Sequence, residues 1–132
     1  FTIYFYFIFS HEGKNRYGYR THPISGERQF HAGLDMAAVY AATVHAAASG
    51  TVTFAGETPG YGKTVVVTHR FGFQTRYAHL TLIYTRKGAK VEKGDVIGFV
   101  GSTGISTGNH LHYEVIKNQK RINPLNFIYG TK

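Results

Sequence analysis

The sequence predicts a mainly β protein built from short strands and tight turns. Sixteen glycines and twenty Phe plus Tyr residues in 132 positions favour strands and turns over helices. Residues 108–115 alternate polar and apolar side chains with period two, which is typical of a strand with one face buried. Residues 63–69 and 73–79 flank a short turn that contains Gly72, so they are expected to pair as a hairpin.

The first nine residues are almost entirely apolar and aromatic. A helix of nine residues cannot cross a bilayer, which requires about twenty, and the basic segment that opens a signal peptide is not found here. We therefore expect an N-terminal strand; the alternative is the end of a membrane anchor that would lie upstream of this chain. Two regions are accordingly expected: residues 1–16 as an N-terminal extension or strand, or as the remnant of a longer precursor, and residues 17–132 as a single domain.

The remaining elements follow from local turn and strand signals. Residues 37–48 are rich in alanine, but the valines and threonines around them favour a strand, a turn and a second strand over a helix. Pro124 is expected in the first turn of a short C-terminal helical segment. The other predicted features are a loop at 57–62 that leaves Tyr61 accessible, a strand, Lys-Gly-Asp turn and strand at 88–101, a loop at 102–108, and a turn at 118–121.

Charge and cysteine content restrict the possible functions. The formal net charge is +8, which favours anionic surroundings such as a cell-wall polymer or simply keeps the domain soluble. Charge is the only feature that would suggest nucleic acid, so no nucleic-acid partner is expected. The chain contains no cysteine, so a metal would have to be held by histidine and carboxylate side chains.

The strand at 108–115 carries the main candidates for chemistry. His110, His112 and Glu114 are two residues apart and so share one face of this strand, about 6.7 Å from one to the next. Two neighbouring imidazoles can bind one metal ion together, or one can bind it while the other transfers protons. A His-x-His pair alone is weak evidence, since the chain has eight histidines.

His31 and Asp35 are candidates for further metal ligands. On a straight strand they would lie about 13 Å apart, too far to share an ion whose bonds to its ligands are about 2 Å long. The backbone must therefore bend between them, and Gly33 is the residue that permits a bend. His79 is expected at the end of a strand, where its side chain can face a cleft.

Three motifs occur in a fixed order: His-Ala-Gly-Leu-Asp at 31–35, Tyr-Ala-His-Leu at 77–80 and Gly-Asn-His-Leu-His-Tyr at 108–113. Together with Tyr-Gly-Tyr-Arg at 17–20 and Val-Glu-Lys-Gly-Asp-Val-Ile-Gly at 91–98, they closely resemble the lysostaphin-type zinc endopeptidases, which cut peptide cross-bridges in bacterial peptidoglycan. The match extends from about residue 17 to residue 125. The resemblance implies an antiparallel β-sheet fold with an active-site groove walled by loops, and an extracytoplasmic location: periplasm, cell envelope or secreted.

The resemblance also implies roles for individual residues. One Zn²⁺ per chain would be bound by His31, Asp35 and His112, while His79 and His110, with pKa values near neutrality, would handle protons. Tyr61 lies where the family often has a tyrosine near the substrate carbonyl. Glu114 shares the face of the two histidines but is interpreted as a residue behind the ligands or an exposed one, and Glu114→Gln is expected to leave turnover largely intact.

Two other functions are compatible with parts of this sequence. A catalytically silent peptidoglycan-binding or regulatory domain of the same fold would not need His79 and His110. A carrier domain of the lipoyl type is suggested by the expected hairpin at 91–98, but this hairpin lacks the Met-Lys-Met tip of a carrier. The sequence does not distinguish which peptide bond is cut, because specificity would reside in loops such as 57–62 and 102–109.

Overall fold

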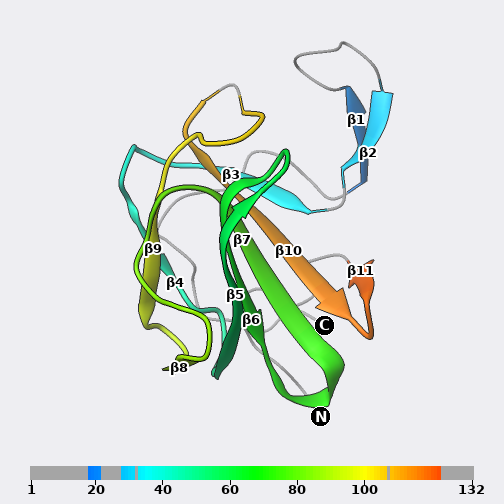
Figure 1. Cartoon of the computed structure of the whole chain (residues 1–132). Coiled ribbons are helices and arrows are strands. Elements are labelled where there is room, and N and C mark those ends of the chain that lie inside the picture. The colour runs from blue at the N-terminus through cyan, green and yellow to red at the C-terminus, as the bar shows by residue number, and fades with distance from the viewer. Residues whose placement is uncertain (1–17, 22–27, 32, 107, 123–132) are drawn as a thin grey trace.

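The computed structural model describes residues 18–21, 28–31, 33–106 and 108–122, with backbone only for 18–21, 28–31 and Leu34. The strand expected at residues 1–9 and the helical turn expected at 123–127 lie outside these ranges. Within them the chain is mostly antiparallel β-sheet with a single 3-10 turn, η1, so the predicted fold class is confirmed (Figure 1). None of the described residues forms a helix that is long and apolar enough to cross a membrane. The elements are β1 (Gly18–Thr21), β2 (Arg28–His31), β3 (Leu34–Ala37), β4 (Thr43–His45), β5 (Gly50–Thr58), β6 (Gly62–Thr68), η1 (Arg70–Gly72), β7 (Phe73–Ile83), β8 (Lys90–Val91), β9 (Val96–Val100), β10 (His110–Lys117) and β11 (Lys120–Ile122).

Nine of the described strands form one sheet, in which β11, β10, β7, β6, β5 and β8 are successive neighbours. The strands β3, β4 and β9 join this sheet from the side: β3 pairs with β10, and β9 pairs with both β4 and β7. The strands β1 and β2 form a separate two-stranded sheet. Figure 1 shows β10 and β7 running side by side across the middle of the molecule, and both strands carry site residues.

Most sequence-based element predictions are confirmed, but two are wrong in detail. The hairpin around residues 70–72 and the strand at 108–115 form as expected. The Lys-Gly-Asp turn also forms, yet its flanking strands do not pair with each other: β8 pairs with β5, and β9 with β4 and β7. The hairpin that suggested a carrier domain is therefore absent from this described part of the chain. His79 is not at a strand end either, because β7 continues to Ile83.

The core lies on the face of β10 opposite to the predicted site. Leu111, Tyr113 and Val115 are fully buried there, while His110, His112 and Glu114 point to the other face, as the alternation predicted. Tyr113 stands directly across from Tyr77 of β7, with ring centroids 5.5 Å apart. This apolar layer fixes the register of β10 against β7, since a slip by one residue would exchange its two faces.

Candidate functional site

The site centres on a contact between Asp35 of β3 and His112 of β10. These residues are direct partners in the antiparallel ladder, and Asp35 Oδ1 lies 2.7 Å from His112 Nδ1. Both side chains are buried. Residues 77 positions apart in sequence thus meet because β3 is the neighbour of β10 on this stretch.

The bend predicted between His31 and Asp35 is present. β2 ends at His31 and belongs to the small sheet, whereas β3 begins at Leu34 and belongs to the large one. Gly33 is required at this bend for a different reason than we expected. A Cβ atom there would lie 2.5 Å from the carbonyl oxygen of Tyr113 and 2.8 Å from Glu114 Cγ, so the position needs the smallest side chain rather than a special backbone angle.

Glu114 holds the other side of the His112 ring. Its Oε2 lies 2.8 Å from His112 Nε2 and accepts a hydrogen bond of 2.9 Å from the Tyr61 hydroxyl. Its Oε1 accepts from Arg76 Nη1 at 3.1 Å and from Arg121 Nε at 3.2 Å. Glu114 is fully buried, so the expectation that it could be exposed is wrong, and its position behind a predicted ligand is confirmed.

The charges around His112 shift its pKa and that of Glu114 in opposite directions. Burial alone would lower the pKa of His112, but the carboxylates of Asp35 and Glu114 outweigh burial and raise it to about 9. Burial alone would raise the pKa of Glu114, but the bond to His112 and the two arginines lower it to about 2. Glu114 is therefore a carboxylate across the whole physiological range of pH.

His79 lies beside this centre at an irregularity in β7. Between Tyr77 and Leu80, β7 has one more residue than the paired stretch of β6, which is a β-bulge, and His79 there has φ of +63°. Its backbone N–H donates to Tyr61 O at 2.8 Å, and its ring lies 4.8 Å from that of His110 between centroids. Positive φ is unusual for a histidine and costs on the order of 1 kcal/mol, which the surrounding pairing must offset.

The hydrogen bonds of His79 and His110 fix which ring nitrogen carries the proton. His79 Nδ1 lies 2.6 Å from Thr103 O, and His110 Nδ1 lies 2.9 Å from Gly108 O. A carbonyl oxygen can only accept, so Nδ1 is the donor in both rings and Nε2 of each neutral ring keeps its lone pair. His110 Nε2 lies 3.6 Å from Asp35 Oδ1.

The expectation of a near-neutral pKa for His79 is wrong. Its side chain is buried, and burial, assisted by the neighbouring His110 and His112, lowers the pKa of His79 to about 4 against the opposing effect of its bond to Thr103. The ring is thus neutral at pH 7, and its Nε2 is a proton acceptor rather than a donor.

Tyr61 is half-buried rather than freely accessible. Its hydroxyl donates to Glu114, receives a hydrogen bond of 3.2 Å from Arg121 Nη2, and its ring centroid lies 5.6 Å from that of His112. Sequence reasoning missed the two arginines of this network. The feature that connects them to Glu114 is their position in the sheet: Arg76 lies directly across from Glu114 in the ladder, and Arg121 lies across from Ile116.

The donor set fits a zinc ion as far as the described side chains show. Carboxylate oxygen and imidazole nitrogen are ligand types that zinc prefers, and Asp35 and His112 present one of each toward the other. A histidine ligand whose second nitrogen is held by a carboxylate, as Nε2 of His112 is by Glu114, is a common feature of zinc sites. Among side chains that the structure describes, no three His, Asp or Glu residues are grouped to hold an ion; the third predicted ligand, His31, is described by its backbone alone.

An acidic residue and a histidine in contact on a β-sheet, with two further histidines beside them, form an arrangement typical of metal-dependent hydrolases. The comparison with known families is more specific, because residues 29–124 match the model of peptidase family M23. The chain belongs to this family.

Individual relatives agree with this assignment. The DD-carboxypeptidase/endopeptidase Mpg of Neisseria meningitidis is 47% identical over 115 residues, 87% of this chain and 26% of its own length. The catalytic domain of lysostaphin from Staphylococcus simulans superposes with a TM-score of 0.81 at 29% identity, covering 89% of this chain and 91% of that domain. A zinc-containing peptidase from Vibrio cholerae gives 0.73 at 32% identity, covering 86% of this chain and 39% of that one.

Other curated relatives, 35 to 38% identical, are named peptidoglycan DD-endopeptidases of Vibrio cholerae. The chain spans about a quarter of the length of the curated relatives it matches.

Proposed function

We propose that this chain is the catalytic domain, over residues 17–132, of a zinc-dependent endopeptidase that hydrolyses peptide bonds of bacterial peptidoglycan. The observation that carries the proposal is the buried contact between Asp35 and His112 with the rings of His79 and His110 beside it. The names of the relatives, as DD-endopeptidases and as lysostaphin, support peptidoglycan as the substrate. Such a substrate lies outside the cytoplasm, so we place the working enzyme in the periplasm, cell envelope or medium.

In this proposal His31, Asp35 and His112 hold one zinc ion. When bound, zinc supplies Lewis-acid chemistry, which acidifies a water molecule and polarises a carbonyl group. His112 must then give up the proton between its Nδ1 and Asp35, while Glu114 keeps the ring in place through Nε2. In the metal-free site, Asp35 and Glu114 fix the orientation of the imidazole from both sides.

His79 and His110 are proposed to move the protons of the reaction. Each ring is anchored by its Nδ1–H to a loop carbonyl, so each Nε2 is available as a base. Hydrolysis of a peptide bond requires a group that accepts a proton from the attacking water and returns it to the leaving amine. The low pKa of His79 keeps it neutral, so that it can act as the acceptor.

Tyr61 was predicted to lie near the substrate carbonyl, and this contact stays a prediction. Its hydroxyl is directed to Glu114 Oε2, the same oxygen that faces His112 Nε2. If Tyr61 acts on turnover through Glu114, substituting it would also change the binding of zinc. If it contacts the substrate carbonyl instead, zinc binding would stay the same, so measuring zinc affinity beside turnover distinguishes the two roles.

The test is digestion of purified sacculi of several cross-link chemistries, with the released fragments identified by mass spectrometry. We expect about one zinc per chain, loss of cleavage with a strong chelator and its return on addition of Zn²⁺. Equal lysis by protein that metal analysis shows to be empty would contradict the zinc mechanism. Zinc-loaded protein that binds sacculi and releases no peptide fragment would instead support a silent domain.

A further inference from the structure

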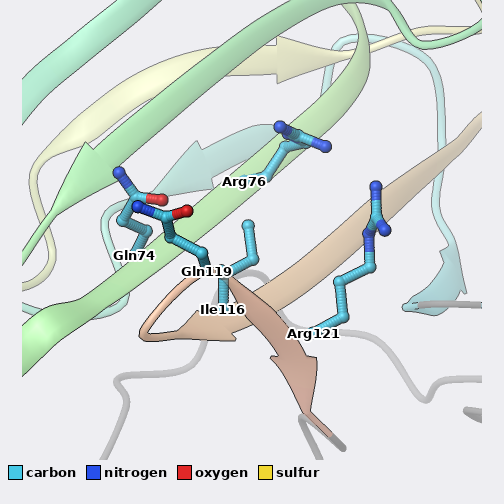
Figure 2. Close-up of a pocket in the computed structure, with 5 residues that line it drawn as sticks. All are labelled: Gln74, Arg76, Ile116, Gln119 and Arg121. Carbon is cyan, nitrogen blue, oxygen red and sulfur yellow. The ribbon is translucent and has the colours of Figure 1, made fainter.

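A basic pocket lies next to the site, between β7, β10 and β11. It encloses about 230 Å³, which suits one side group of a larger ligand rather than the whole of it. Figure 2 shows the side chains around it, with contributions from all three strands and from the turn between β10 and β11. Its lining consists of Gln74, Arg76, Ile116, Gln119 and Arg121.

The pocket lies on the same sheet face as the proposed zinc ligands. Residues His112, Glu114 and Ile116 are spaced by two along β10, so their side chains project to one side. Ile116, the apolar part of the lining, is four residues beyond His112, or about 13 Å along the strand. The ladder places Gln74 across from Ile116 and Arg76 across from Glu114, which keeps these two residues in the same stretch of the face.

Two arginines line the pocket. Arg76 and Arg121 both donate to Oε1 of Glu114. The side chains of Arg76 and Arg121 are 24% and 45% exposed, so a ligand in the pocket can reach both. Arginine is the side chain best suited to bind a carboxylate, since its planar donors match the two oxygens.

We propose that this pocket binds a free carboxylate of the substrate peptide, two to four residues from the bond that is cut. The proposal rests on the proposed function, because it takes a peptide as the ligand. An extended peptide rises about 3.3 Å per residue, so a chain lying along the face from His112 reaches the pocket within four residues. The amide of Gln119 and the amide oxygen of Gln74, whose nitrogen donates to Thr68 Oγ1, can hydrogen-bond to the peptide groups on either side of that carboxylate.

The test uses two pentapeptides that differ in one group. The first is L-alanyl-γ-D-glutamyl-L-lysyl-D-alanyl-D-alanine, in which D-glutamate carries a free α-carboxylate two residues before the terminal D-alanyl bond. In the second peptide D-isoglutamine replaces D-glutamate, so the carboxylate becomes a carboxamide. We expect kcat/KM of the wild type to favour the acid by about 10-fold or more, the usual size of one charge-assisted hydrogen-bond pair.

The Arg121→Gln variant should reduce this ratio to near 1; because Arg121 also donates to Glu114, activity on both peptides is expected to fall, and the ratio is therefore the readout. Lys120→Gln is the matched control, because it removes the same charge from the adjacent position of β11 but does not line the pocket. Its ratio should stay that of the wild type. Equal losses on both peptides in Arg121→Gln, or a wild-type ratio of 1, would overturn the proposal.

Binding measured without turnover separates this proposal from the proposed function. The two peptides are titrated calorimetrically into zinc-loaded His110→Ala protein, alone and combined with Arg121→Gln. A preference for the acid that disappears in Arg121→Gln supports the pocket even if the wild type cleaves neither peptide. The endopeptidase activity is judged separately on purified sacculi, where the absence of released fragments would count against the proposed function. Cleavage of both peptides with no preference in binding would leave the activity standing and exclude the pocket.

Discussion

His112 Nε2 lies 2.8 Å from Oε2 of Glu114, the second residue after it on the same strand. The alternation of β10 brings the two side chains to one face, and full burial of Glu114 keeps water from replacing either partner. The other oxygen of Glu114 is held by two arginines. This carboxylate is therefore a fixed part of the site, and the earlier expectation that Glu114→Gln leaves turnover intact is revised.

Glu114→Gln should weaken zinc binding by about 10- to 100-fold, the usual effect of removing a carboxylate behind a histidine ligand. A glutamine side chain offers only one acceptor oxygen to donors that now reach both oxygens of Glu114. The affinity is measured by competition with a chromogenic chelator. Glu92→Gln, which removes an exposed acid far along the chain, is the control, and wild-type affinity in Glu114→Gln would show that Glu114 does not orient His112.

Gly33→Ala should destabilise the fold and disturb the site together. The added methyl group would lie within 3 Å of Tyr113 O and Glu114 Cγ, and overpacking of this kind costs about 1 to 3 kcal/mol. Gly56→Ala is the matched control, because the nearest atom to its methyl would be 3.6 Å away, an ordinary contact. Urea unfolding of both variants checks the prediction, and equal stability would mean that β3 and β10 can move apart at no cost.

The positive φ of His79 predicts an unusual order of stabilities. Glycine adopts φ of +63° without penalty and alanine does not, so His79→Gly should be more stable than His79→Ala by about 1 kcal/mol. Ala78→Gly, one position earlier and outside the positive-φ region, should show the reverse effect and lose stability relative to its parent. Greater stability of His79→Ala would show that this backbone angle relaxes once the imidazole is gone.

Burial of His79 predicts a loss of stability in mild acid. Its pKa is about 4 in the folded chain and about 6.5 when unfolded, so between these values the unfolded state binds more protons. The free energy of unfolding should fall as pH drops through 6.5 toward 4, with no contribution from this group above that window. In metal-free protein, the free energy of unfolding of His79→Gln should fall less steeply than that of the wild type over this range, whereas parallel curves would show that His79 titrates normally.

The fold and the placing of His110, His112 and Glu114 on one face could be predicted from the sequence because these features depend on local pattern, whereas the roles of the site residues are implied by the resemblance of the three motifs to a known family. The two faces of β10 follow from its period-two alternation, and the bend after His31 follows from the distance that two shared ligands require. The bulge at His79 could not be predicted, since it results from pairing of β7 with β6. The partners of Glu114 depend on which strands become neighbours. No local pattern in the sequence indicates that Arg76 of β7 and Arg121 of β11 both contact this carboxylate.

The two histidines of β10 are expected to have different roles although they share one face. Zinc content and turnover measured side by side on His110→Ala and His112→Ala test this expectation most directly. His110→Ala should keep its zinc and lose about 100-fold or more in turnover, the usual contribution of a general acid or base, and His79→Ala should behave in the same way. His112→Ala should lose the metal along with activity. Loss of zinc from His110→Ala while His112→Ala retains it would contradict the account.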